Sequence, residues 1–392
     1  MKNKGIKMSE IKSETIYFDN AATTKPLPKV IEEVTKSYTE SYGNPSSTHR
    51  MGQKVKGILE KTRGIVARHF GVENSEIIFT SGGAEGNNLI LKGASNFYRE
   101  KGNHIITSKI EHPTVLDTCR ELEKNGFRVT YLNVTEDGVI DLEQLKNEIT
   151  DETILVSIMY ANNETGVVQP IKEIGEILKD KNILFHTDAV QAVGKQNIDV
   201  KELNIGALTA TAHKFYGLKG VGFVFLDKKF FLKKEIFGGS QERNRRAGTE
   251  NVNGILALGV ALEEISKNMM ETMKSEKELL LYLEKRVKNE IEDVKINGEL
   301  VQRIGNVASI TIKGCDIQTM LIGLDMRNIC VSGGSACMSG AQEDSHVLQA
   351  MGLDENDLKS TFRVSLGRYN TREEVDYFVE KLKEVVEIER KN

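Results

Sequence analysis

The chain has 392 residues, which is more than one ordinary hydrophobic core organises, so we expect two domains. Hydrophobic residues make up 39% and charged residues 28% of the chain, which is typical of a globular protein and excludes a disordered one. The net charge of −4 argues against direct binding to nucleic acid. The lack of a long apolar run argues against a membrane span.

The first residues, Met1 to Glu14, contain lysines and acids but no apolar segment, unlike a secretory signal or an Arg-rich transit peptide. We therefore expect a cytoplasmic protein. Four cysteines do not make a disulfide framework, and their spacing matches no zinc site. Cys119 and Cys330 lie in apolar patterns that predict packed thiols, whereas Cys315 falls at a predicted turn and receives no role.

Strand and helix patterns alternate along the first two thirds of the chain. Apolar runs at 16–18 and 76–79 predict short strands, and helices are expected between them at about 30–42 and 49–71. Further strands are predicted at 104–107, 127–132, 153–159, 183–185, 205–208 and 222–226, with helices beginning near residues 111, 142 and 171. This alternation predicts an α/β fold with a mostly parallel sheet and helices on both faces.

A polar, basic loop at 238–250 leads into a single long helix predicted from about 252 to 288. Its charged middle indicates exposure, so we expect this helix to join two domains. Strands near 307–312 and 361–366, with helices between and after them, are typical of a smaller α+β unit. The predicted domains are a large one, residues 15–260, whose N-terminal segment packs on the other, and a small one, residues 261–392.

An acid and a lysine follow two neighbouring strands of the predicted sheet. Asp188 and Lys214 in these positions suit pyridoxal phosphate, because the lysine forms a Schiff base and the acid keeps the pyridinium nitrogen protonated. An isolated His-Lys pair after a strand is more often a lysine facing water, so this interpretation depends on its neighbours. Ligands of such sheets lie beyond the carboxyl ends of the strands, where the chain places Ala84, His112, Asn163, Asp188 and Lys214.

The strand at 76–79 runs into a glycine-rich turn, residues 80–86, which opens a helix. Such a turn exposes backbone N–H groups at the positive end of the helix, which suits a phosphate. A tight strand-to-helix turn without a ligand explains the same residues equally well. Both interpretations stay open on this segment alone.

Cys337 lies in a segment of small residues, 331–341, that is nearly free of bulky apolar side chains. This composition is typical of a mobile loop, and it argues against a buried loop cysteine.

Together these motifs resemble those of the pyridoxal-phosphate-dependent cysteine desulfurases of the NifS/IscS type, which are class V aminotransferase-like transferases of fold type I. The resemblance extends over about residues 17–386. The longer loop from Cys337 to His346 looks like the group I form of the family. The motifs that carry the resemblance are, in order, 18–24, 43–47, 111–112, 162–166, 186–191, 213–214, 246–249, 335–337 and 362–368.

The resemblance implies a role for each matching residue. Lys214 corresponds to the Schiff-base lysine, Asp188 to the pyridinium partner, and His112 to a stacked imidazole that carries protons. Arg363 corresponds to the arginine that clamps the substrate carboxylate, which the residue alone would suggest only as a surface salt bridge. The implied contacts with substrate, ring hydroxyl and phosphate also include Gly83, Ala84, Asn163, Gln191, Thr211, His213 and Thr249, the last lent by a second subunit of a homodimer.

Ala84 departs from the family pattern, in which threonine is usual. A hydroxyl there would bond the phosphate, and a hydrogen bond to a charged group is worth about 1.5–3 kcal/mol. We therefore expect weaker cofactor binding at this site. A specialised paralogue, or a scaffold that binds iron–sulfur assembly partners without activity, are the alternatives that this residue motivates.

The implied activity converts L-cysteine into L-alanine and leaves a persulfide on Cys337, whose thiolate is the nucleophile. The implied acceptor is an iron–sulfur scaffold protein or a tRNA-thiolation enzyme. Metal contact is implied only transiently, from the Cys337 persulfide to an iron–sulfur cluster. A selenocysteine lyase or an aminotransferase on the same scaffold remains an alternative, although transamination needs no such thiol.

Overall fold

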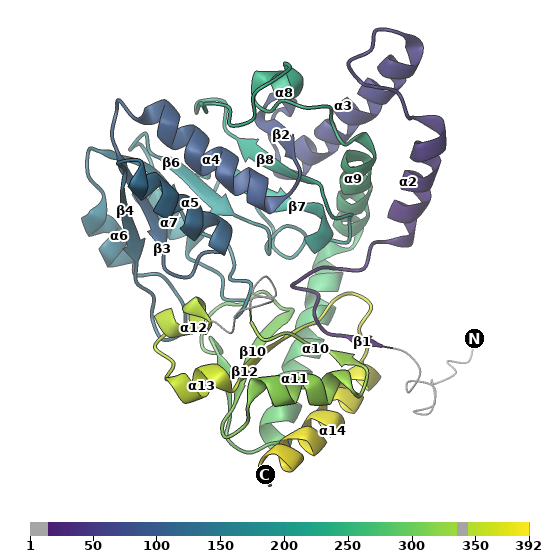
Figure 1. Ribbon diagram of the computed structural model, residues 1–392, viewed down its shortest axis with the longest axis vertical. Coiled ribbons are helices and arrows are strands. Elements are labelled where there is room, and N and C mark those ends of the chain that lie inside the picture. The colour runs from purple at the N-terminus through teal and green to yellow at the C-terminus, as the bar shows by residue number, and fades with distance from the viewer. Residues whose placement is uncertain (1–14, 335–343, 392) are drawn as a thin grey trace.

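The computed structural model describes residues 15–334 and 344–391, which fold into two parts (Figure 1). A seven-stranded sheet forms the first part, and a three-stranded sheet forms the second. The helix α10 (Met269–Glu290) passes from one part to the other in Figure 1. Among the helices of the described ranges, none is long and apolar enough to cross a bilayer.

The large sheet has the strand order β2-β8-β7-β6-β5-β3-β4. Only β8 runs antiparallel to its neighbours, so the predicted mostly parallel sheet is confirmed. The inner strands are apolar runs buried on both faces, as expected for parallel strands covered by helices. The strands are β2 (Ile77–Thr80), β3 (His104–Ser108), β4 (Arg128–Leu132), β5 (Thr153–Ser157), β6 (Leu184–Asp188), β7 (Ala207–Thr211) and β8 (Gly222–Leu226).

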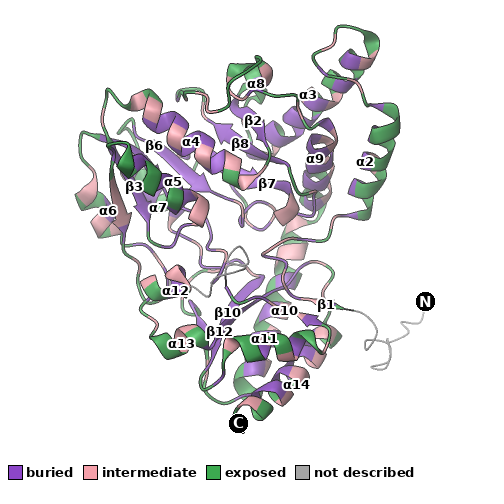
Figure 2. Cartoon of the chain, viewed as in Figure 1, coloured by how far each residue is buried: buried purple, intermediate pink, exposed green. Residues whose placement is uncertain are grey.

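Helices cover this sheet on both faces, and each face has its own apolar core. Figure 2 shows the buried residues along the strands and the exposed residues on the outer helix surfaces. One face carries α4 (Gly83–Tyr98) and α5 (Pro113–Lys124). The other carries α2 (Pro28–Glu40), α3 (Arg50–Phe70), α7 (Ile171–Leu178) and α9 (Val252–Lys267), and α6 (Leu142–Glu148) packs beside β4 and α7.

The single helix predicted from 252 to 288 is wrong, because the chain forms two helices there. Asn268 separates α9 from α10 with φ −133° and ψ 29°, outside the helical region. α9 packs against α2 and α3, whereas α10 packs against the small sheet and α14 (Arg372–Glu389). The domain boundary expected at residues 260 and 261 therefore falls inside α9, and the chain changes partners at Asn268.

The second part is built on an antiparallel sheet with the order β12-β10-β9. The N-terminal strand β1 (Ile16–Tyr17) pairs in parallel with β11 (Ile329–Cys330) of this part. Phe18 follows β1 and is fully buried in the same core. The other elements here are β9 (Val294–Asn297), β10 (Val307–Ile312), β12 (Thr361–Ser365), α11 (Ile317–Asp325), α12 (His346–Ala350) and α13 (Glu355–Lys359).

Candidate active site

A cavity of about 90 Å³ lies beyond the carboxyl ends of β5, β6 and β7. Both parts of the molecule contribute to its wall, since β12 supplies Arg363 and the segment after β1 supplies Ala21 and Ala22. The structure thus brings together six of the residues singled out in the sequence. Their side chains are those of His112, Asn163, Asp188, Gln191, Lys214 and Arg363.

Asp188 is the last residue of β6 and is 5% exposed. Its Oδ2 accepts a hydrogen bond from Asn87 Nδ2 at 2.7 Å, and its Oδ1 accepts one from the backbone N–H of Val190 at 3.0 Å. Asn87 also donates to Thr114 Oγ1 at 2.9 Å, so it ties α4 and α5 to the carboxylate. Asn87 was not predicted from the sequence, because nothing local relates it to a carboxylate 101 positions later.

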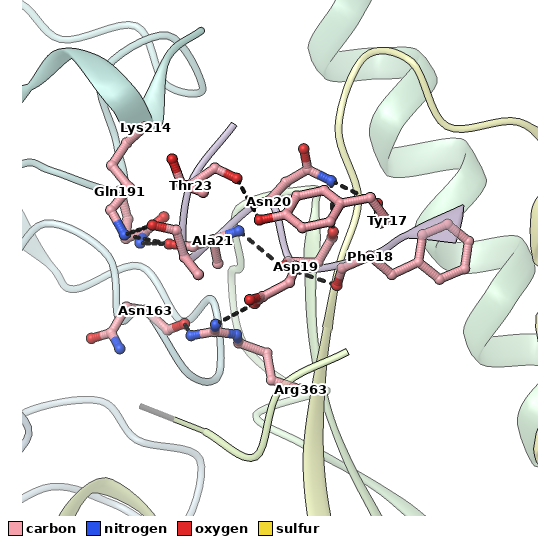
Figure 3. A network of polar contacts seen from close by, with 12 residues as sticks. Tyr17, Phe18, Asp19, Asn20, Ala21, Thr23, Asn163, Gln191, Lys214 and Arg363 are labelled. Atoms are coloured by element: carbon pink, nitrogen blue, oxygen red, sulfur yellow. Dashed lines mark hydrogen bonds and ion pairs between the residues drawn. The ribbon is translucent and has the colours of Figure 1, made fainter. Parts of the chain in front are cut away.

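Lys214 lies in a short 3₁₀ turn, Ala212–Lys214, that follows β7. Its Nζ donates to the carbonyl oxygens of Ala21 at 2.5 Å and Ala22 at 2.8 Å (Figure 3). Tyr216, two residues on, has φ +67°, a strained value that the backbone holds by donating to Thr24 Oγ1 at 2.7 Å. The motif at 18–24 therefore has a physical role, because it supplies the acceptors that hold the lysine.

His112 is the N-cap of α5, where its Nδ1 accepts from the backbone N–H of Thr114 at 3.2 Å. Burial lowers the pKa of His112, and the nearby Asp188 carboxylate opposes this shift only partly. The imidazole is therefore neutral near pH 7. Since Nδ1 accepts a hydrogen bond, the single proton is on Nε2.

Arg363 is 2% exposed, so it does not make the surface salt bridge that the residue alone suggested. Its Nη2 pairs with Asp19 Oδ1 at 2.7 Å, and its Nη1 donates to the backbone oxygen of Asn163 at 2.9 Å (Figure 3). Nε is buried and has no hydrogen-bond partner among the residues that the structure describes. The guanidinium is thus oriented by two contacts and retains N–H groups for a further acceptor.

Glu111, which precedes His112, is a fully buried acid beside the site. Its Oε1 accepts from Ser108 Oγ at 2.6 Å and from the backbone N–H of Met159 at 3.0 Å. Burial raises the pKa of Glu111 to about 8, so its carboxyl is mostly protonated at neutral pH.

The residues predicted around a phosphate do not line this cavity but lie beside its wall, since Gly83 approaches Val190 and His213 precedes Lys214. Gly82 has φ +157°, a conformation open to glycine, and it is the N-cap that precedes α4, whose first turn contains Gly83 and Ala84. Burial lowers the pKa of His213 to about 4, and its Nδ1 lies 3.2 Å from Thr23 Oγ1. Thr211 Oγ1 lies 3.2 Å from the Val221 carbonyl oxygen and donates to it.

Thr249 and Cys337 are also predicted to act at this site. Thr249 lines a neighbouring hollow together with Ser81 and Arg246, not the cavity that contains Lys214. Cys337, predicted as the sulfur-accepting thiol, lies outside the described residues. Cys119 is buried and Cys330 is half-buried, in agreement with the packed thiols predicted there, and Cys315, for which no role was predicted, is also buried.

Residues 16–378 match the family model of the class-V aminotransferases. The chain is 45% identical over 380 residues, 96% of each protein, to the cysteine desulfurase IscS of Clostridium botulinum. A solved NifS-like protein is similar with a TM-score of 0.90 and 38% identity, over 95% of this chain and 100% of that one. A structure of SspA in complex with cysteine is similar with a TM-score of 0.81 and 35% identity, over 91% and 100%.

The chain therefore belongs to the class-V aminotransferase family. This confirms the predicted family and the fold of a type I pyridoxal-phosphate enzyme. Pyridoxal phosphate is the cofactor of this family, so the predicted cofactor is confirmed.

The residues of the cavity fit this cofactor. An amine, Lys214, and a buried carboxylate with two fixed donors, Asp188, share one wall, as a carbonyl carbon and a pyridinium nitrogen require. At Gly83 an added Cβ would lie 3.0 Å from Val190 Cγ2, so the start of α4 approaches the turn after β6 so closely that a side chain there would require Val190 to shift. The N–H groups of that helix start suit the phosphate.

Proposed function

We propose that this protein is a cysteine desulfurase, which converts L-cysteine into L-alanine and leaves a persulfide on Cys337. One observation carries the proposal: a single cavity holds the amine of Lys214, the buried acid Asp188 and the guanidinium of Arg363. The 45% identity to a named cysteine desulfurase over nearly the whole chain supports the same reaction. The role of Cys337 rests on the sequence alone.

The chain's own groups have distinct roles in this proposal. Bound pyridoxal phosphate supplies the electron sink for bond cleavage at the substrate. Asp188 holds the proton of the ring nitrogen, because two donors fix its carboxylate in the cavity wall. Lys214 Nζ takes the Cα proton of the substrate, and His112, with its proton on Nε2, is a proton carrier within the same wall.

Arg363 binds the substrate carboxylate through N–H groups that Asp19 and Asn163 leave available. The Cys337 thiolate then attacks the substrate sulfur. An S–S bond forms, the Cβ–S bond breaks, and its electron pair with one proton completes the methyl group of alanine.

We further propose a cytoplasmic homodimer with shared sites. Thr249 supports sharing, because it is exposed and lies outside the cavity wall of its own chain. The packing of α9 supports a large domain that ends near Asn268 and a small domain after it. The sulfur acceptor would be an iron–sulfur scaffold protein or a tRNA-thiolation enzyme.

The test measures alanine and sulfide released from L-cysteine with pyridoxal phosphate and a reductant. We expect equal amounts of both from the wild type and neither from Cys337→Ala, while Cys330→Ala, a half-buried cysteine, serves as the control that retains activity. Equal release by wild type and Cys337→Ala would replace the desulfurase with a lyase. Bound cofactor without either product would contradict the proposal and favour transamination.

A further inference from the structure

Lys195 is a buried lysine that the proposed reaction does not use. It is 7% exposed and lies in the turn after β6, four positions beyond Gln191. Its Nζ donates to Gln191 Oε1 at 3.1 Å. Burying an ammonium group costs free energy, and an apolar side chain of similar size would avoid that cost. Packing alone therefore does not explain why a lysine occupies this position.

An acid of another element lies near the charge of Lys195. Glu276 of α10 lies on the same small internal cavity, and its carboxylate favours the ammonium form that burial disfavours. Tyr216 O–H donates to Glu276 Oε1 at 3.1 Å and accepts from the backbone N–H of Arg368 at 2.9 Å. Lys195 thus donates to the wall of the candidate active site and faces a carboxylate of α10 across this cavity.

Gln191 has both ends of its side-chain amide engaged. Oε1 accepts from Lys195, and Nε2 donates to the Ala21 carbonyl oxygen at 2.9 Å, the same oxygen that accepts from Lys214 Nζ (Figure 3). A flipped amide would set Nε2 against the ammonium group and Oε1 against the carbonyl. Both contacts would be repulsive, so Lys195 and the Ala21 carbonyl oxygen together determine the orientation of the amide.

We propose that Lys195 is a positioning residue, which fixes the Gln191 amide so that the cavity wall beside Lys214 presents an N–H donor. The inference rests on the proposed site, because its consequence is for a cofactor oxygen that lies against this wall. Such an oxygen meets a donor when Lys195 is present. Without Lys195, only the contact of Nε2 with the Ala21 carbonyl oxygen favours this orientation, so the amide is held less firmly.

The test is a double-mutant cycle on the holoenzyme with Lys195→Met, Gln191→Leu and the double variant. Two readouts are followed: the absorption maximum of the bound cofactor, and the dissociation constant of pyridoxal phosphate titrated into apoprotein. We expect both single variants to shift the maximum in the same direction and to weaken binding about fivefold, the effect of one net hydrogen bond. The double variant should match Gln191→Leu, because Lys195 acts through Gln191.

Two further variants complete the design. Lys195→Arg retains a donor and should restore the wild-type maximum, and Lys201→Met makes the same substitution at an exposed lysine and should change neither readout. If Lys195→Met lowers the melting temperature but leaves the maximum and the binding constant unchanged, the lysine is only structural and the inference fails. Additive effects in the double variant overturn it as well.

If Lys195→Met does not fold, the Lys195→Arg variant tests the positioning role of Lys195 instead. A shift of the maximum as large as that of Gln191→Leu would then overturn the inference, and an unchanged maximum would support it. A failure of the desulfurase proposal would give a different result. The wild type would then release no alanine, while the absorption maxima of the three variants would still be non-additive.

Discussion

At the scale of single residues, the site depends on pairs formed between distant segments. Asp188 is oriented by Asn87, Arg363 by Asp19, and Lys214 by a backbone carbonyl of Ala21. Each partner comes from another element than the residue it holds. The charged residues that line the cavity were singled out from motifs, whereas their partners follow only from the packing of α4 and of the N-terminal segment on the sheet.

A buried acid in this site makes stability depend on pH. The pKa of Glu111 is raised to about 8 from its ordinary value of 4.5, so folding takes up a proton between these two values. The free energy of unfolding therefore falls as pH rises from 4.5 to 8, by at most about 1.36 kcal/mol per pH unit for one group. Glu111→Gln removes this dependence, so its stability relative to wild type should increase through that window and level off above it.

Denaturant unfolding at several pH values measures this difference. Glu136→Gln, at an exposed position, is the control and should follow the wild type at every pH. A constant difference between Glu111→Gln and wild type across the window would show that Glu111 is ionised in the folded protein.

At the scale of elements, alanine substitutions at two glycines of α3 are expected to have opposite effects on stability. Gly71 ends the helix with φ +66°, and Gly57 lies inside it, while neither has an atom within 4 Å of an added Cβ. Only backbone energetics therefore differ between them. Gly57→Ala should stabilise the protein by about 0.5–1 kcal/mol, and Gly71→Ala should destabilise it by about 1–2 kcal/mol.

Thermal unfolding of the two variants in the same buffer checks both signs. Cofactor affinity should stay at the wild-type value in each, because α3 contributes nothing to the wall of the cavity. Stabilisation by Gly71→Ala would mean that the helix end does not require the left-handed conformation.

The elements also mark the limit of what the sequence could predict. Buried strands such as β5 and β6 were evident from apolar runs, and α3 from its periodicity and its terminal glycine. The break at Asn268 was not, because no glycine or proline marks it and only the divergent partners of α9 and α10 separate the helices. The pairing of β1 with β11 has no local signal, since each strand is two residues long.

At the scale of the whole molecule, the N-terminal segment connects the second core to the candidate active site. Phe18 is buried in that core with its ring centroid 5.5 Å from that of Phe378. One residue later Asp19 pairs with Arg363, and Ala21 and Ala22 follow to hold Lys214. A change in this core is therefore expected to displace the residues that hold Lys214 in the cavity wall. The N-terminal segment transmits this change because it is distant from Lys214 in sequence but next to it in space.

Phe18→Ala and Phe378→Ala test this connection as a matched pair. Each removes a fully buried ring from the same core, so each should destabilise the protein by about 3–5 kcal/mol. Only Phe18 leads directly into the residues that hold Lys214 and Arg363, so only Phe18→Ala should also weaken pyridoxal phosphate binding and raise the KM for L-cysteine under conditions where both variants are folded. Equal losses of cofactor affinity in the two variants would mean that the core acts through general stability, and the N-terminal segment would then not be the link between core and site.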